Sequence, residues 1–181
     1  MEKKDLLKDV IKHIDIKSYN STELIDAMRN MSFTSRDTAR AADILMMMCK
    51  EKECTNILTL AGSTSAAGCM QVYVDMVRNK MIDVVVATGA SIIDMDLFEA
   101  LGFKHYIGEK ENVIADTTLR DLYIDRIYDT YIDEEELQAC DHTTFEIANM
   151  LEARPYSSRE FIYEIGKWLH DGHAVKKDSL I

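Results

Sequence analysis

The sequence has a single proline, seven glycines and no long apolar run, and each shortage excludes a class of protein. So few turn-forming residues argue against an all-β fold and favour helices with buried strands. No stretch approaches the ~18 consecutive apolar residues of a membrane-spanning helix, and the mixed charges near the N-terminus do not form a signal peptide. Hydrophobic residues make up 47% of the 181, which is enough for a core. We therefore expect a folded protein that does not contact a membrane.

Clusters of basic residues are also missing. Lys and Arg number 21 against 32 Asp and Glu, which gives a formal net charge of −11. Without a basic patch, we expect no binding to nucleic acid. The acidic balance instead favours cationic partners, such as a polyamine or a basic protein.

The cysteines and histidines form no metal or redox motif. The cysteines are Cys49, Cys54, Cys69 and Cys140. They contain no C-x-x-C pair, and we interpret them as small buried side chains of a cytoplasmic protein. Only His170 and His173 have the spacing of metal ligands, but Gly172 between them predicts a helix end. We therefore expect no metal site.

The first fifty residues have the apolar periodicity of helices. Residues 5–14 predict one helix, and Asn20 with Glu23 predicts the capped start of a short second helix. Ser35 predicts the start of a third helix that runs to about Lys50. The inward face of this third helix is predicted to carry Ala39, Ala42, Leu45, Met46 and Cys49.

From about residue 53 the pattern changes to alternating strands and helices. Residues 56–61 and 82–88 are short apolar runs that predict buried strands, and each is followed by a loop of small residues and a helix. The second of these helices is predicted over roughly 95–101, with Gly102 as its end. Residues 103–107 are a candidate third strand. This alternation predicts an α/β fold, in which a parallel sheet has helices on both faces.

The C-terminal part of the sequence is predicted to be mainly helical. Residues 126–132 are ambiguous between a strand and an irregular segment. Asp133 with Glu136, and Ser157 with Glu160, have the spacing of capping boxes at helix starts. The last residues, KKDSLI, end on two apolar side chains. This ending fits either a natural C-terminus or the beginning of another strand.

Two loops of small residues are the leading candidates for a ligand site. The first, residues 62–68 (GSTSAAG), follows the first predicted strand, and its glycines let the backbone approach a ligand closely. Backbone N–H groups at the start of the following helix suit a pyrophosphate. The loop is neither a G-x-G-x-x-G motif nor a Walker motif. Taken alone, it fits an ordinary strand-to-helix turn equally well.

The second loop, residues 88–91 (TGAS), strengthens the case for a ligand site. Ligands of open α/β sheets bind at the carboxyl ends of the strands, where both loops are predicted to lie. Asp94 and Asp96 follow, and they suit ribose hydroxyls, a cationic substrate or a metal, or they cap a helix. We favour ligand binding for Asp94 and capping for Asp96. We interpret His105, in the candidate third strand, as a structural histidine.

Several segments resemble the amino-terminal half of the deoxyhypusine synthase family. They are residues 57–68 (ILTLAGSTSAAG), 82–108 (IDVVVATGASIIDMDLFEALGFKHYIG), 122–132 (LYIDRIYDTYI) and the stretch RPYSSREF near Pro155. The last stretch is similar to the prokaryotic branch of the family. The resemblance runs from about residue 15 onward and is most specific over 82–108.

The resemblance implies a Rossmann-like sheet, NAD as cofactor and a homotetramer with active sites between subunits. Family members oxidise spermidine and hold its aminobutyl group on an enzyme lysine as an imine. They then transfer the group to a lysine of the initiation factor 5A precursor. Some relatives transfer it instead to a diamine, putrescine, and make homospermidine.

The resemblance also implies which residues form the site. The NAD contacts correspond to Gly62, Ser63, Thr64, Ser65, Ala66, Thr88, Gly89 and Ala90. Asp94 is the best match to a position that helps to hold cofactor or polyamine, and Asp96 is a second candidate carboxylate for the substrate. We interpret residues 1–181 as one α/β domain, with a helical lead-in over 1–52 and an NAD-binding part over 53–181.

The catalytic lysine of the family belongs to a carboxyl-terminal half that this sequence lacks. No lysine here matches its motif, so we assign no catalytic residue and expect the chain alone to be inactive. We interpret the chain as the incomplete, cofactor-binding part of such an enzyme: a truncated product, a fragment or one chain of a split enzyme. The alternatives are a non-catalytic subunit that completes or regulates a full-length relative, and a nucleotide-binding module with another task.

Overall fold

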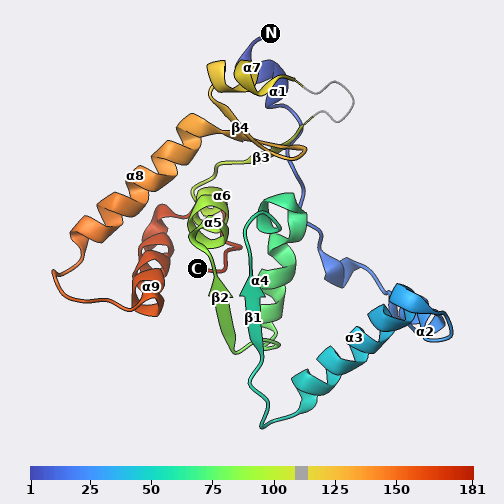
Figure 1. Cartoon of the computed structure of the whole chain (residues 1–181). Coiled ribbons are helices and arrows are strands. Elements are labelled where there is room, and N and C mark those ends of the chain that lie inside the picture. Colours follow the sequence, from blue (N-terminus) through green and yellow to red (C-terminus); the bar gives the residue numbers. More distant parts are fainter. Residues whose placement is uncertain (109–113) are drawn as a thin grey trace.

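The computed structural model describes residues 1–108 and 114–181 and combines helices with two small sheets (Figure 1). One sheet is parallel and has two strands, and the other is antiparallel and has three. The mixed α/β class is therefore confirmed. The strands divide between two sheets, however, and do not form the one parallel sheet that the alternation predicts.

The N-terminal segment forms only a short helix, α1 (Lys3–Leu6), so the helix predicted over 5–14 is wrong. Val10 instead forms an antiparallel bridge with Tyr106. Neighbouring backbone groups hydrogen-bond along the same edge at 2.7 and 2.9 Å. This pairing satisfies N–H and C=O groups that a longer helix would have satisfied internally.

A short turn, η1 (Ile16–Ser18), leads to the predicted second helix, α2 (Thr22–Met28). The side chain of Asn20 accepts a hydrogen bond from the backbone N–H of Thr22 at 3.0 Å. Asn20 therefore satisfies a free N–H group at the helix start, although the N-cap position is Ser21, whose side chain makes no capping hydrogen bond.

The third helix, α3 (Phe33–Lys50), starts slightly before Ser35. Of its predicted inward face only Ala39 is buried. The reason is visible in Figure 1, where α3 packs against α2 and both project away from the rest of the chain. The prediction of a buried face is therefore wrong for three exposed residues, Leu45, Met46 and Cys49.

The parallel sheet consists of β1 (Ile57–Leu60) and β2 (Val84–Ala87), where the sequence predicts two strands. The crossover between them contains η2 (Ser65–Cys69) and α4 (Met70–Arg78). Gly68 has a φ of +99° at a kink inside η2, just before α4 begins. Glycine reaches this conformation without the steric cost that a side chain imposes.

A continuous helical run follows β2 directly. It consists of α5 (Gly89–Ser91), η3 (Ile92–Leu97) and α6 (Phe98–Ala100). The run begins earlier than the predicted residue 95, because the small residues of its first turn carry no apolar periodicity. Gly102, with a φ of +100°, ends it as predicted.

The antiparallel sheet has the strand order β3-β5-β4. Its strands are β3 (His105–Ile107), β4 (Ile124–Ile127) and β5 (Thr130–Asp133). The candidate strand over 103–107 therefore exists, but it does not join the parallel sheet. The ambiguous segment 126–132 lies in the hairpin of β4 and β5, and this hairpin places β5 beside β3.

The remaining helices are α7 (Asp116–Asp121), α8 (Glu134–Met150), α9 (Ser158–Trp168) and η4 (Leu169–His173). Both predicted caps are confirmed. The carboxylate of Asp133 accepts hydrogen bonds from the N–H groups of Glu135 and Glu136. Ser157 and Glu160 form a reciprocal capping box at the start of α9.

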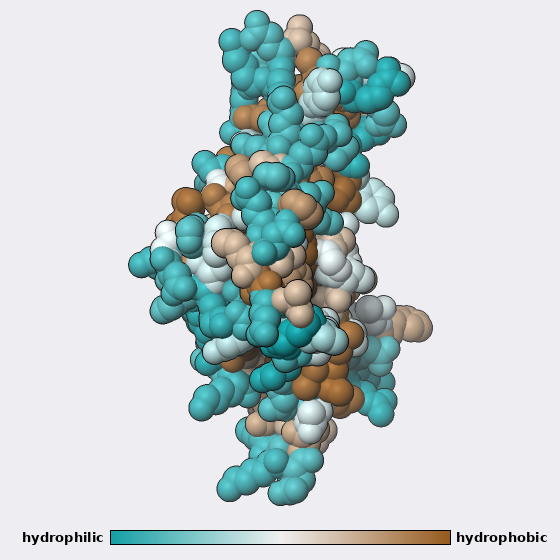
Figure 2. Space-filling model, turned by 90° about the vertical axis from the view of Figure 1, so that its left-hand side faces the viewer, coloured by the Kyte–Doolittle hydropathy of each residue, from teal (hydrophilic) through white to brown (hydrophobic). Residues whose placement is uncertain are grey.

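The largest apolar core lies where α6, η3, α8 and α9 meet. Its buried members are Leu97, Phe98, Ala100, Ile132, Cys140, Ile147, Ile165 and Leu169. Other apolar side chains remain on the surface, and Figure 2 shows brown patches between the hydrophilic areas of one face. Within residues 1–108 and 114–181, no helix is both long and apolar enough to cross a membrane.

Candidate functional site

The two loops of small residues lie next to each other at the carboxyl ends of β1 and β2. The backbone N–H of Thr88 donates to the carbonyl of Leu60 at 3.3 Å. A Cβ atom added to Gly62 would lie 3.1 Å from the Cβ of Ala90. This separation is tighter than ordinary van der Waals contact, so the absence of a side chain at Gly62 lets the loops approach. The structure thus brings both predicted halves of the site together.

The first loop has an inner and an outer side. Ser65 and Ala66 are both buried, and the Ser65 hydroxyl has no hydrogen-bond partner among the described residues. Thr64 is exposed, and its hydroxyl accepts a hydrogen bond from Tyr73 at 2.9 Å. Ser63 has a φ of +81°, in the left-handed region that favours glycine. The outer side of the loop therefore presents Ser63 and Thr64, while Ser65 and Ala66 support it from below.

The second loop is the open N-terminus of the helical run. The side chain of Thr88 makes no capping hydrogen bond. A Cβ atom added to Gly89 would meet no other atom within 4 Å. Backbone N–H groups in the first turn of a helix carry a partial positive charge and bind anions. The space in front of Gly89 therefore suits a negatively charged group such as a pyrophosphate.

Asp94 lies on η3 and faces α8. Partial burial raises the pKa of the Asp94 carboxyl above its ordinary value, and the negative charge of Asp141 in α8 raises this pKa further. The thiol of Cys140 donates to the carbonyl of Ile93 at 3.4 Å, which places α8 close to this part of η3. The negative charges of Asp94 and Asp141 together attract a cation.

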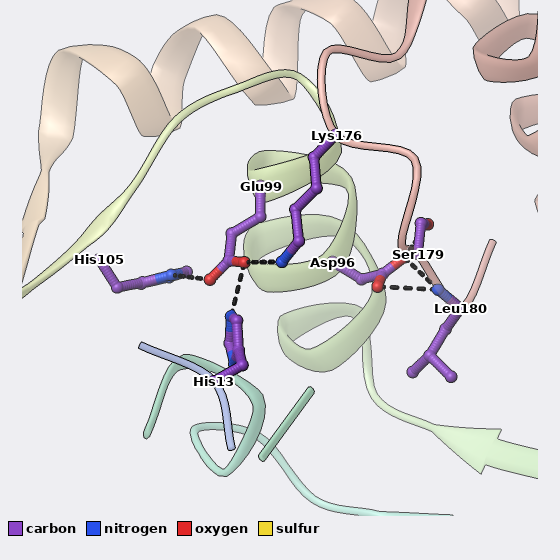
Figure 3. Close-up of polar contacts among 7 residues, drawn as sticks. All are labelled: His13, Asp96, Glu99, His105, Lys176, Ser179 and Leu180. Atoms are coloured by element: carbon purple, nitrogen blue, oxygen red, sulfur yellow. Dashed lines mark hydrogen bonds and ion pairs between the residues drawn. The ribbon is translucent and has the colours of Figure 1, made fainter. Parts of the chain in front are cut away.

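Asp96 is fully buried and holds the C-terminal tail (Figure 3). Its carboxylate accepts hydrogen bonds from the hydroxyl of Ser179 and from the backbone N–H groups of Leu180 and Ile181. Burial raises the pKa of Asp96, although these hydrogen bonds oppose the rise. The interpretation of Asp96 as a helix cap is wrong, because the helical run begins at Gly89 and Asp96 lies in its interior.

A second buried carboxylate, Glu99, is one turn further along the same run. It binds His13 Nε2 at 2.7 Å, His105 Nδ1 at 2.9 Å and Lys176 Nζ at 2.6 Å (Figure 3). Burial alone would raise the pKa of Glu99, but the hydrogen bonds from His105, His13 and Lys176 outweigh it and hold the pKa well below its usual value. The interpretation of His105 as a structural histidine is confirmed by its burial and this bond.

No sequence motif marks Glu99 as a functional residue. The available signal was its spacing from Asp96, since residues three apart lie on the same side of a helix. Together, these two carboxylates attach the tail to the helical run that begins at the second loop. The anchored tail thus helps to fix the helix whose N-terminus is open.

The cysteines differ in burial, and one of them adjoins the first loop. Cys54 and Cys69 are half-buried, and the backbone N–H of Cys69 donates to the carbonyl of Thr64 at 3.2 Å. Cys140 is buried as predicted, and burial raises the pKa of its thiol to about 12. Cys49 is exposed, so the interpretation as a buried side chain is wrong there. His173 stacks on Trp168 with ring centroids 4.0 Å apart. Among the residues that the structure describes, no group of three or more metal-ligating side chains is placed to hold a metal.

Comparison with known proteins decides the family of the chain. A family model described as deoxyhypusine synthase matches residues 23–181. The chain belongs to the deoxyhypusine synthase family. Among the curated members of this family, a deoxyhypusine synthase-like protein of Caulobacter vibrioides is 66% identical over 180 residues, which is 99% of this chain and 48% of the relative.

Other members of the deoxyhypusine synthase family give the same picture. A deoxyhypusine synthase-like protein of Coxiella burnetii is 59% identical over 179 residues, covering 99% of this chain and 50% of the relative. A probable deoxyhypusine synthase 2 of Methanosarcina acetivorans is 37% identical over 168 residues, covering 93% of this chain and 48% of the relative. The chain therefore spans about half the length of the curated relatives it matches.

Proposed function

We propose that this chain supplies the NAD-binding loops of a deoxyhypusine synthase-type aminobutyl transferase. The observation that carries the proposal is the contact of the two loops, in which Gly62 lies against Ala90 beside the open helix start at Gly89. Two parallel strands with a helical crossover, followed by this open helix, also suit a Rossmann-like cofactor site.

Each of the two loops has a different role in holding the cofactor. Backbone N–H groups at Gly89 and Ala90 would hold the pyrophosphate, and Thr88 would line the approach. Gly62, Ser63 and Thr64 form the facing wall, and Ser65 with Ala66 supports it from the buried side. Bound NAD would supply the acceptor for the hydride that is removed from the carbon beside an amine of spermidine.

Asp94 is our candidate for the cationic substrate or the cofactor. The negative charge of Asp141 near its carboxyl favours a positively charged group, such as an amine of spermidine, beside it. Asp96 was the second candidate, but its carboxylate already accepts hydrogen bonds from the tail. We therefore propose that Asp96 positions the helical run and does not itself bind spermidine.

The complete reaction needs a lysine nucleophile that this chain does not provide. We propose that the half of the relatives that the chain does not span carries it, and that the active form is a homotetramer or a complex of complementary chains in the cytoplasm. The acceptor is the initiation factor 5A precursor or a diamine such as putrescine.

Mass spectrometry of the reconstituted reaction tests this proposal. The chain is combined with the half of the Caulobacter relative that it does not match, together with NAD, spermidine and either acceptor. We expect an aminobutyl adduct on the precursor lysine, or homospermidine when putrescine is supplied. Absence of both products from a complex that is folded and binds NAD would contradict the proposed transfer and favour a non-catalytic role.

A further inference from the structure

One face of the parallel sheet is apolar and open to solvent. Ile57 is 58% exposed, Val86 is 55% exposed and Val84 is 41% exposed. The register pairs Ile57 with Val84 and Thr59 with Val86, so these four side chains lie on the same face of the sheet. Along β1 the exposure alternates, and Leu60, on the opposite face, is buried.

An open face is unusual for a parallel sheet. Parallel sheets occur almost only with both faces covered, because the crossover connections place helices on them. The two strands, ILTL and VVVA, are apolar on both faces, as strands inside a covered sheet are. The helix α3, which directly precedes β1, points away from the sheet in Figure 1 and leaves this face open.

The comparisons indicate what covers the face. The relatives are about twice as long as the part that this chain matches, so the family fold has a further half of similar length that is available to cover this face. A groove of about 520 Å³ runs along β2 toward α9, and its lining includes Val84 and Val86 of the exposed face and Ile162 of α9. Apolar surface therefore continues from β2 onto the helices, which gives a second helix layer a larger area to cover.

We propose that Ile57, Thr59, Val84 and Val86 form the docking surface for a helix from the half of the family fold that this chain does not span. The helix presents an apolar stripe to the sheet and completes its second covering layer. The inference rests on the proposed function only in one respect, the choice of the other half of the family fold as the partner that covers this surface. It requires neither cofactor nor substrate, so its test is read without NAD.

Binding between the two halves, measured by calorimetry or sedimentation without NAD, tests this proposal. The chain offers a matched pair of variants: Ile57→Lys on the proposed surface, and Ile107→Lys in the antiparallel sheet, where Ile107 is 56% exposed. We expect Ile57→Lys to weaken binding about tenfold or more, since a buried lysine charge is costly. Ile107→Lys should bind as the wild type does.

A second variant and a folding control separate the loss of binding from the loss of folding. Val86→Thr keeps the β-branched shape, so the weaker binding that we expect from it would reflect the cost of burying a hydroxyl where the wild type buries a methyl group. Circular dichroism checks that every variant is folded. Equal binding by Ile57→Lys, Val86→Thr and the wild type would overturn the proposal. Self-association of the chain through this face, even when the second half is supplied, would overturn it as well.

Discussion

Glu99 is the residue at which distant parts of the chain converge. His13 lies 86 positions before it and Lys176 lies 77 positions after it, yet both bind the same carboxylate. His105 adds a third bond from β3. A buried carboxylate with three donors fixes the N-terminal segment, the antiparallel sheet and the tail relative to one helix.

Replacing Glu99 with glutamine should destabilise the fold. The substitution keeps the shape but removes the charge that Lys176 and the two histidines bind, and breaking a buried pair in this way costs about 3 kcal/mol. The control is Glu146→Gln, which removes an exposed Glu–His pair with His142 and should change little. Urea unfolding at neutral pH measures both variants. Equal midpoints for the two would show that the Glu99 cluster contributes no special stability.

The lowered pKa of Glu99 also predicts an acid dependence. A folded-state pKa below the unfolded value means that ionised Glu99 stabilises the fold above about pH 4.3, the ordinary pKa of glutamate. This stabilisation is lost as the pH falls through the folded-state pKa. The stability difference between the wild type and Glu99→Gln should therefore shrink from about pH 7 to about pH 3. A difference that is constant or larger in acid would contradict the assignment.

Among the helices and strands, features that depend on residues close in the sequence are predicted better than pairings between strands that are distant in the sequence. The caps at Asp133 and Ser157 depend on residues within one helical turn, and both predictions are confirmed. β3 was predicted as a strand, but its sheet was not, because its partners come from a hairpin whose periodicity is ambiguous. The segment around Val10 was missed for a similar reason, since its bridge to Tyr106 is not visible in its own apolar pattern.

The start of α9 offers a clean test of a capping box. Ser157→Ala removes the side-chain oxygen that accepts the Glu160 N–H at 3.2 Å. The loss should cost about 1 kcal/mol of folding stability. Ser158→Ala, one position inside the helix, is the matched control and should be close to neutral. Thermal or urea unfolding compares the two, and a neutral Ser157→Ala would show that α9 does not depend on this cap.

At the scale of the molecule, the candidate site was only partly predictable. Both loops are recognisable in the sequence by their small residues. A backbone that approaches a ligand closely leaves no room for large side chains. The tail contacts of Asp96 and the position of Asp94 beside α8 were not predictable, since both depend on where residues far along the chain pack. The family resemblance is confirmed, and the Rossmann-like details stay a prediction.

Titration of NAD by calorimetry tests the central claim, that the two adjacent loops form one cofactor cradle. The protein is the chain reconstituted with the other half of a relative, as wild type and as Gly89→Val. The fold has room for a side chain at Gly89, so the variant should unfold at the wild-type temperature but bind NAD about tenfold or more weakly, because the new side chain fills the cradle. Wild-type NAD affinity in Gly89→Val, or no NAD binding by the reconstituted wild type, would contradict the claim.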